Sequence, residues 1–229
     1  MSNYQIDETS KDVLLSHDGQ QVMMEWEKPY MEAAIDLLKP TGDVLEIGFG
    51  LGYSATRIMA HNPKSYTLIE CDPDVIERVH KWMLDYPNTK ITVVRGRWQE
   101  QLHNLGIFDQ IFFDDFPLGV GKDSSPLEIN LSTKRSTLFI DLCIKSHMRV
   151  GSRISLYLNG NAMPHLSSDS KPFVEVWTKT IPIEIPDNCK YRNIGEQRCT
   201  IPIIEKNAEY DRIIAQEYGL AEIRKQMKV

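Results

Sequence analysis

Residues 43–52 read DVLEIGFGLG, a short apolar run that ends in a glycine cluster. From Glu46 to Gly52 the pattern is E-x-G-x-G-x-G. Glycine there permits a tight turn and lets a ligand approach the backbone closely. A dinucleotide fingerprint, G-x-G-x-x-G, would need a glycine where the chain has Tyr53, so the stretch does not match an NAD site. It predicts a strand and a ligand-binding turn, and a plain strand-to-helix turn is the alternative.

Short apolar runs alternate with amphipathic stretches along the rest of the chain, which is typical of βαβ units and a parallel sheet. After 43–47, the runs expected as strands are 65–69, 90–94, 109–113 and 153–158. The stretches expected as helices are 32–38, 54–60, 73–86 and 133–147, with Asp72 as the N-cap of the third. Two further extended runs, 173–185 and 199–204, are expected to pair as an antiparallel hairpin at the sheet edge.

These elements predict an α/β, Rossmann-like fold with a mostly parallel seven-stranded sheet and helices on both faces. We expect three parts: residues 1–40 as a helical cover, 41–206 as the sheet domain, and 207–229 as a charged helical tail. The tail carries apolar residues, and it is expected either to lie on the surface or to contact a second copy in a homodimer.

Composition narrows the class of protein. The chain has 229 residues, 41% of them hydrophobic and 25% charged, as in ordinary globular domains. With a net charge of −6 and no basic stripe, neither nucleic acid nor a membrane is the expected partner. The N-terminus has no signal-peptide pattern, and Cys71, Cys143, Cys189 and Cys199 form no C-x-x-C pair. We expect reduced cysteines in a cytoplasmic protein, with a Cys189–Cys199 bridge as the alternative.

A second acid strengthens the case for a nucleoside cofactor. Glu70 closes the run 65–69, where a Rossmann-like sheet places the carboxylate that accepts from both ribose hydroxyls. Trp98 and Gln99 follow the next run, where an adenine would rest, although Trp98 could equally be a core residue. S-adenosylmethionine (SAM) fits a glycine turn without phosphate-cradling geometry, because its methionine moiety carries no pyrophosphate.

Two acidic positions are candidates for the reacting centre. Asp114 follows the run 109–113 and should face the cofactor at the carboxyl edge of the sheet, although a turn or cap residue is the alternative. The segment 22–31, VMMEWEKPYM, places Glu27 just before Pro29. Its residues alone indicate only part of an N-terminal cover helix.

The segments HDGQQVMMEWEKPYM, LEIGFGLG, LIECDPDV, GRWQE, FFDDFPL and CTIPIIEK together resemble the guanidinoacetate N-methyltransferases and the fungal protein arginine N5-methyltransferases. Both are class I SAM-dependent enzymes. The resemblance spans roughly residues 17–206, and VMMEWE and GRWQ look closer to the arginine enzymes. The ankyrin-like N-terminal region of those enzymes has no counterpart here, which favours a small substrate.

The resemblance implies roles for particular residues. Glu27 and Asp114 would hold the guanidino group, as the catalytic pair. Asn159, Gly160 and Asn161 match a turn whose backbone binds the substrate. The positions that would line the SAM pocket are Met23, Met31, Glu46, Gly48, Phe49, Gly50, Leu51, Gly52, Tyr53, Ser54, Glu70, Cys71, Trp98, Gln99 and Asp114.

The chain departs from the family on the substrate side of this pocket. Asp115 replaces a threonine or similar residue, and the loop 119–130 is unlike that of the guanidinoacetate enzymes. Gly160 and Asn161 stand where a leucine–threonine pair is expected. These changes leave the identity of the guanidino compound open.

The chemistry is consistent with the implied roles. A guanidinium is permanently charged, and carboxylates grip its fork of N–H donors bidentately. Two carboxylates would orient one nitrogen, offset the repulsion between guanidinium and sulfonium, and accept a proton. No metal is required.

We therefore expect a SAM-dependent methyltransferase acting on a small guanidino compound, free arginine or guanidinoacetate-like. A protein-arginine methyltransferase is the second hypothesis. A silent SAM-binding module is the third, and the retention of both carboxylates argues against it.

Overall fold

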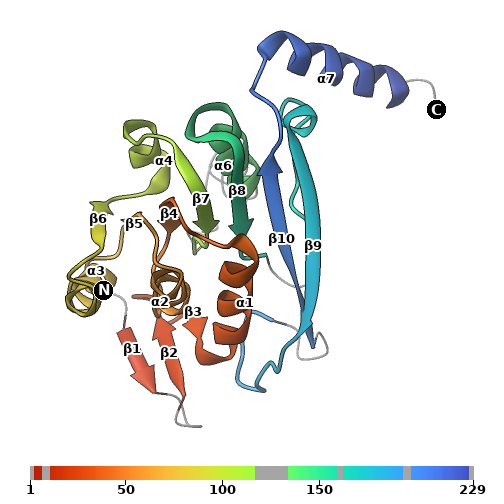
Figure 1. Cartoon of the computed structure of the whole chain (residues 1–229). Helices are drawn as coiled ribbons and strands as arrows, with labels where there is room; N and C mark the ends of the chain where they lie inside the picture. The colour runs from red at the N-terminus through yellow and green to blue at the C-terminus, as the bar shows by residue number, and fades with distance from the viewer. Residues whose placement is uncertain (1–2, 7–10, 117–133, 159–161, 193–196, 227–229) are drawn as a thin grey trace.

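A central seven-stranded sheet organises the chain in the computed structural model, which describes residues 3–6, 11–116, 134–158, 162–192 and 197–226. The strand order is β6-β5-β4-β7-β8-β10-β9 (Figure 1). The strands are β4 (Asp43–Ile47), β5 (Ser65–Glu70), β6 (Lys90–Arg95), β7 (Phe108–Phe113), β8 (Met148–Leu156), β9 (Val174–Pro182) and β10 (Arg198–Lys206). Strands β4 to β8 pair in parallel, whereas β10 is antiparallel to both β8 and β9. The predicted mostly parallel sheet with a C-terminal hairpin is confirmed.

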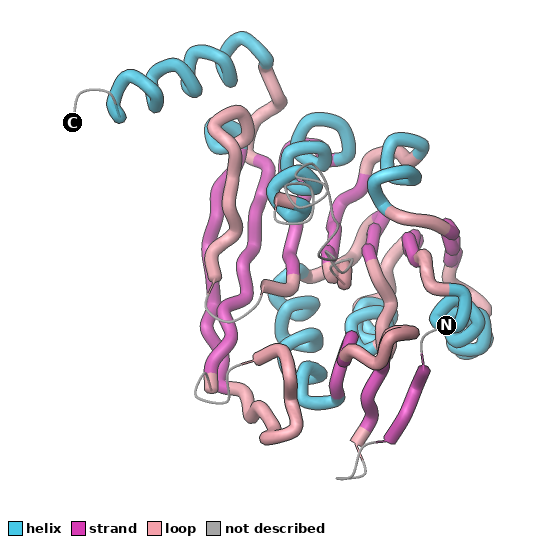
Figure 2. Tube along the Cα trace, turned by 180° about the vertical axis from the view of Figure 1, so that it is seen from behind, coloured by secondary structure: helices cyan, strands magenta, loops and turns pink. Residues whose placement is uncertain are grey.

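Helices cover both faces of this sheet, as Figures 1 and 2 show from opposite sides. The helices of the sheet region are α1 (Lys28–Leu38), α2 (Tyr53–Ala60), α3 (Pro73–Trp82), α4 (Trp98–Gln101) and α6 (Arg135–Leu142). Helical turns of other kinds occupy Met83–Asp85, Leu102–Asn104, Lys171–Phe173 and Cys143–His147. Asp72 caps α3 as predicted, since its Oδ1 accepts from Asp74 N at 2.8 Å and Val75 N at 3.2 Å.

Two hydrophobic cores lie on opposite faces of the sheet. Neighbouring residues of one strand point to opposite faces, so Val44 belongs to one core and Leu45 to the other. The first core contains Tyr30 of α1 and Ala55 of α2, and the second contains Phe139 of α6. The sheet therefore buries apolar side chains on both of its faces.

The expected helical cover of residues 1–40 is wrong for its first part. Instead, β1 (Asn3–Ile6), β2 (Asp12–Leu15) and β3 (Gln21–Met24) form a separate antiparallel sheet. Gly19, with φ +78°, lies in the β2–β3 connection, where Ser16 N donates to Gln20 O at 2.8 Å. Glycine readily adopts this left-handed conformation, so Asp18-Gly19 was an overlooked hairpin signal. A short 3-10 turn, Glu25–Glu27, then leads into α1.

The C-terminal tail is helical as predicted, with α7 spanning Arg212–Gln226. It projects away from the sheet (Figure 1). Within the described part of the chain, no helix combines the length and apolarity that a membrane crossing would need. All four cysteines are free in the structure, with Cys71 exposed and Cys143, Cys189 and Cys199 buried.

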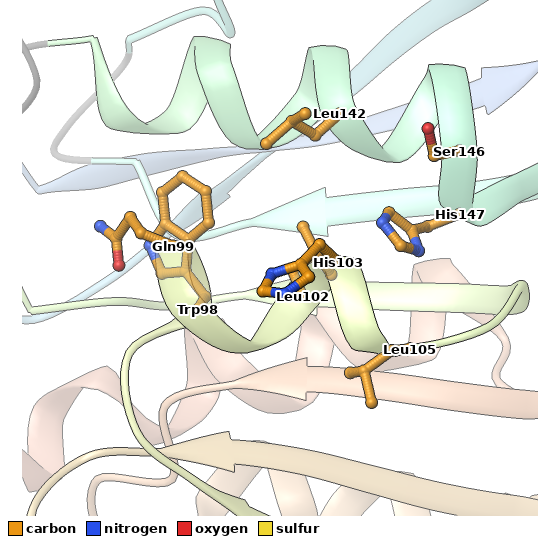
Figure 3. A pocket seen from close by; sticks show the side chains of 8 residues that line it. All are labelled: Trp98, Gln99, Leu102, His103, Leu105, Leu142, Ser146 and His147. Atoms are coloured by element: carbon orange, nitrogen blue, oxygen red, sulfur yellow. The ribbon is translucent and has the colours of Figure 1, made fainter.

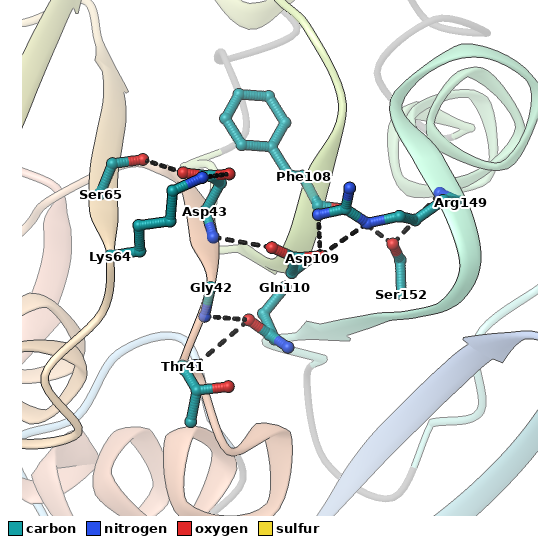
Figure 4. A network of polar contacts seen from close by, with 10 residues as sticks. All are labelled: Thr41, Gly42, Asp43, Lys64, Ser65, Phe108, Asp109, Gln110, Arg149 and Ser152. Atoms are coloured by element: carbon teal, nitrogen blue, oxygen red, sulfur yellow. Dashed lines mark hydrogen bonds and ion pairs between the residues drawn. The ribbon is translucent and has the colours of Figure 1, made fainter.

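Polar contacts join the starts of neighbouring strands (Figure 4). Asp109 accepts from Asp43 N at 2.9 Å and from Arg149 Nε at 2.8 Å. Ser152 donates to Phe108 O at 2.7 Å. These contacts lie at the amino ends of β4 and β7, which leaves the opposite edge for ligands.

Candidate active site

The glycine turn lies against the carboxyl end of β7. Gly48, Gly50 and Gly52 all have positive φ, at +80°, +54° and +80°. A Cβ on Gly48 would stand 2.2 Å from the carbonyl oxygen of Asp114. Gly48 therefore has to be glycine both for its conformation and for this close approach.

Glu46, Glu70 and Asp114 come from three neighbouring strands, β4, β5 and β7. Because parallel strands end at the same edge, their side chains gather at one end of the sheet. The structure places these acids at the carboxyl edge of the sheet, as predicted. Their local surroundings differ, and the differences suggest separate tasks.

Glu70 ties the glycine turn to the start of α3. Its Oε2 accepts from Phe49 N at 2.9 Å, and its Oε1 accepts from Cys71 N at 2.7 Å and Asp72 N at 2.9 Å. Burial raises the pKa of this carboxyl, while the backbone donors lower it. Since a carboxylate has about four acceptor positions, one remains for a ligand hydroxyl. Glu70 thus mainly stabilises the connection between the glycine turn and α3, and it has one acceptor position for a ligand hydroxyl rather than two.

Glu46 is fully buried beneath the turn. Its Oε2 accepts from the Tyr66 hydroxyl, whereas its Oε1 has no hydrogen-bond partner among the described residues. Burial raises the pKa of Glu46 to about 7. A buried carboxyl next to a glycine-rich turn, with only the Tyr66 and Ser54 hydroxyls to oppose the effect of burial, fits a ligand that carries a cationic group, as SAM does.

Glu27 lies in the turn between β3 and α1 and is only 2% exposed. Its Oε1 accepts from Met24 N at 2.9 Å and from the Tyr191 hydroxyl at 2.6 Å. Burial raises the pKa of Glu27 to about 7, against the opposing effects of these two donors, of Tyr157 and of the nearby Arg192 cation. The local pattern assigned Glu27 no role, whereas the family resemblance placed it at the guanidino group, and the fold gives it a buried, oriented carboxyl.

Asp114 belongs to the same electrostatic cluster. Its pKa is raised well above the usual range, first by burial and then by the negative charges of Glu27, Glu46 and Asp115, while Arg135 opposes them. Glu27 and Asp114, 87 positions apart by their residue numbers, are therefore close enough to influence each other's ionisation. Such a cluster favours a cationic ligand, because a positive charge between the carboxyls would relieve their repulsion.

Asp115 is occupied by structural contacts. Trp98 Nε1 donates to its Oδ2 at 2.9 Å, and Arg135 Nε donates to its Oδ1 at 2.7 Å. This residue departs from the family pattern, and it links β7 to α4 and α6. Asp115 thus helps to place Asp114 without needing to touch a ligand.

Trp98 is a core residue in this fold, one of the two alternatives the sequence left open. It is 5% exposed and packs edge-to-face on Phe113 and Phe139, with centroids 5.9 and 5.2 Å away. With Gln99 it lines one end of a cavity of about 320 Å³ between α4 and the α6 region (Figure 3). The other lining residues are Leu102, His103, Leu105, Leu142, Ser146 and His147.

The other expected cofactor and substrate positions differ in their burial and contacts. Met23 touches the turn, since Leu51 N donates to its Sδ at 3.2 Å, and Ser54 is buried at the start of α2. Met31 is fully buried within the core, and Phe49 packs on Trp82 at 5.3 Å. Tyr53 is half-buried and Cys71 is exposed. Asn159, Gly160 and Asn161 lie outside the described residues.

Sequence reasoning missed the aromatic and cationic surroundings of Glu27. These surroundings come from two places in the chain. Tyr157 directly follows β8, whereas Tyr191 and Arg192 lie between β9 and β10. The Tyr157 hydroxyl is buried and lies close enough to Glu27 to lower the pKa of that carboxyl. Arg192 lies with its guanidinium carbon 5.9 Å from the Trp26 ring centroid. No local pattern marks these residues, because their partners are more than 100 positions away.

Comparison with protein families gives a match to the family described as guanidinoacetate N-methyltransferase, over residues 2–125. Among curated proteins, protein arginine N-methyltransferase 2 of Yarrowia lipolytica is 38% identical over 117 residues, 45% of this chain and 24% of that protein. The Saccharomyces cerevisiae protein of the same name is 34% identical over 47% of this chain and 27% of its own. The Gibberella zeae protein is 28% identical over 76% of this chain and 39% of its own. The chain thus spans well under two thirds of these relatives.

Solved structures share the α/β fold at low identity. A spermidine synthase in complex with the transition-state analogue AdoDATO matches 94% of this chain and 75% of its own, with TM-score 0.58 and 16% identity. The N-methyltransferase NodS of Bradyrhizobium japonicum matches 80% of this chain and 97% of its own, with TM-score 0.52 and 12% identity. These likenesses confirm the Rossmann-like fold.

Proposed function

Because this chain belongs to the guanidinoacetate N-methyltransferase family, we propose that it is a SAM-dependent enzyme that methylates a guanidino nitrogen. The observation that carries the proposal is the pairing of two carboxyls, Glu27 and Asp114, within one buried electrostatic cluster. A guanidinium stays charged at any physiological pH and would neutralise this cluster.

The residues divide the chemistry between them. Bound SAM would supply the methyl group, carried as an electrophile on a positively charged sulfur. Glu46 and the glycine turn would hold that cofactor at the edge of the sheet. Glu27 and Asp114 would grip the guanidinium so that one nitrogen faces the methyl group, which provides proximity. Asp114 would accept the proton that this nitrogen loses as it forms the new bond to carbon.

We further propose a small substrate, free arginine or a guanidinoacetate-like acid. Glu27 is 2% exposed and lies under the segment that carries Tyr191, where Ile183, Ile185 and Cys189 are also buried. A small molecule reaches such a carboxyl more easily than an arginine attached to a protein does. The second candidate is a protein arginine, which the names of the curated relatives favour.

A methyl-transfer assay read by mass spectrometry tests this function. The panel is free arginine, guanidinoacetate, other guanidino acids and an arginine peptide, each with SAM. We expect turnover of one small compound, and a loss of about 100-fold or more in Asp114→Asn, because the proton acceptor is removed. Asp85→Asn, an exposed aspartate far along the chain from the cluster, is the matched control and should keep full activity.

The outcomes separate the hypotheses. Turnover of the peptide alone would replace the small substrate by a protein one. Methylation of a different nucleophile, or full activity in Asp114→Asn, would overturn the guanidino assignment.

A further inference from the structure

The segment that follows β9 folds back onto the small N-terminal sheet. The side chain of Gln21, the first residue of β3, bonds its backbone twice. Gln21 Nε2 donates to Asn188 O at 2.9 Å, and Gln21 Oε1 accepts from Lys190 N at 2.7 Å. One amide side chain therefore fastens this segment on both sides of the buried Cys189.

Tyr191 follows directly on this fastened stretch. Its ring lies 6.0 Å from that of Trp26, tilted by 30°. Its hydroxyl donates to Glu27 Oε1 at 2.6 Å, a short distance that is typical of a bond to a charged acceptor. Trp26 and Glu27 are neighbours in one turn, so the ring and the hydroxyl of Tyr191 contact two consecutive side chains.

The two oxygens of Glu27 are consequently not equivalent. Oε1 accepts from both Tyr191 and Met24 N, at 2.6 and 2.9 Å, and two donors fill its two lone pairs. The two hydrogen bonds from Met24 N and Tyr191 both end on Oε1, which leaves acceptor capacity on Oε2 for a ligand, with the Tyr157 hydroxyl as a further polar group beside this carboxyl. A carboxylate anchored on one side has a single orientation to offer on the other.

We propose that Tyr191, fastened by Gln21, is a positioning residue that holds the Glu27 carboxylate with Oε2 presented to the guanidino group of the substrate. This role rests on the proposed function. Tyr191 does not touch the reacting atoms in this scheme. It acts through Glu27, by fixing its direction and by favouring its ionised form with a hydrogen bond.

The ionisation of Glu27 also depends on the other groups that face it. Asp114 at the end of β7 is a like charge, while Arg192 is an opposite charge beside Tyr191. Tyr157, at the end of β8, contributes a hydroxyl. None of these groups is altered by replacing Tyr191 with phenylalanine, so the change in Glu27 reports the loss of one donor.

The test is the pH profile of kcat/KM for Tyr191→Phe against wild type, using the guanidino compound that wild type methylates. Loss of a hydrogen bond to a charged group predicts a fall of about 10- to 100-fold at neutral pH. The acid limb of the profile should move to higher pH, because the charged form of Glu27 loses a donor. The affinity for SAM alone, measured by calorimetry, should stay within about twofold of wild type. Such a difference is small beside the expected fall in kcat/KM.

Matched variants distinguish positioning from a general loss of structure. Tyr30→Phe also removes a buried hydroxyl, but that hydroxyl donates to the backbone carbonyls of Leu156 and Thr200, so it should lower thermal stability without changing the pKa of Glu27. Gln21→Ala should shift the limb in the same direction as Tyr191→Phe. The double variant should fall short of the sum of the two, since both act on one unit.

Two results would overturn the proposal in distinguishable ways. An active wild type with an unmoved acid limb in Tyr191→Phe removes the positioning role and leaves the proposed function standing. A wild type that methylates no guanidino compound removes both. A carbon-13 NMR titration of the Glu27 carboxyl in the two proteins gives a readout independent of turnover, and an unchanged pKa there would also exclude the role.

Discussion

At the scale of single residues, the site is a group of carboxyls placed where ionisation is costly. Glu27 and Glu46 both have a pKa raised to about 7, and burial is the largest cause for each. A buried carboxyl without a full counter-charge lowers the stability of the ligand-free protein as pH rises from its ordinary pKa to the raised one. This cost is consistent with the proposed role of these residues in binding a cation.

Glu27→Gln tests this at one position. The native pKa of about 7 lies above the ordinary value of 4.5, so from about pH 4.5 to 7 the unfolded chain loses its proton first and stability falls as pH rises. Glutamine keeps the shape and cannot ionise. We expect the difference in free energy of unfolding between Glu27→Gln and wild type to grow in favour of the variant by on the order of 1–3 kcal/mol from pH 5 to pH 8.

Urea unfolding at both pH values measures this gain. Glu184→Gln, an exposed glutamate of the segment after β9, is the control and should change stability by less than about 0.5 kcal/mol at either pH. An equal effect of Glu27→Gln at the two pH values would contradict the raised pKa.

At the scale of elements, the junction of β4 and α2 sets the geometry of the proposed cofactor site. Its glycine turn is held from several directions at once. Gly48 N donates to Ile69 O and Asp114 N donates to Ile47 O, both at 3.0 Å, while Met23 covers Gly50. The turn thus connects three strands and the N-terminal sheet, and a change there reaches all of them.

Gly48→Ala should damage both stability and cofactor binding. A methyl group would meet the Asp114 carbonyl, and φ +80° is unfavourable for alanine, so we expect a loss of roughly 1–3 kcal/mol. SAM affinity should fall by roughly tenfold or more, equivalent to about 1.4 kcal/mol, as the turn shifts. Gly106→Ala is the control, because its Cβ would meet nothing within 4 Å. If calorimetry found SAM affinity unchanged in Gly48→Ala, the turn would not be the cofactor site.

At the scale of the whole molecule, the chain consists of a sheet domain, an N-terminal sheet that shares its core, and an outlying helix. Met23, Met24 and Trp26 belong to the same core as Tyr66 of β5. In contrast, α7 leaves most of its apolar side chains exposed. They are Ile213, Ile214, Tyr218, Leu220 and Ile223.

A chain that ends after Ala215 should keep its fold and its site. Ala215 is the buried residue of α7 and would be retained, so we expect a melting temperature within a few degrees of the full chain, which corresponds to about 1 kcal/mol. SAM affinity should also be unchanged. Sedimentation of both forms would show whether the removed residues support a homodimer. A collapse of stability on truncation would mean that α7 packs on the body in solution.

Local sequence patterns predicted the sheet, its parallel part, the C-terminal hairpin, the cap at Asp72 and the gathering of Glu46, Glu70 and Asp114 at one edge. Each of these follows from local periodicity or from the rule that parallel strands end together. The local signal at Gly19 was present but overlooked. Three features depend on long-range packing instead. They are the core position of Trp98, the hydrogen bonds of Glu70 to the glycine turn, and the hydrogen bond from Tyr191 to Glu27. That last contact joins residues 164 positions apart, and no pattern within one sequence encodes such a distance, because it depends on how the folded elements pack.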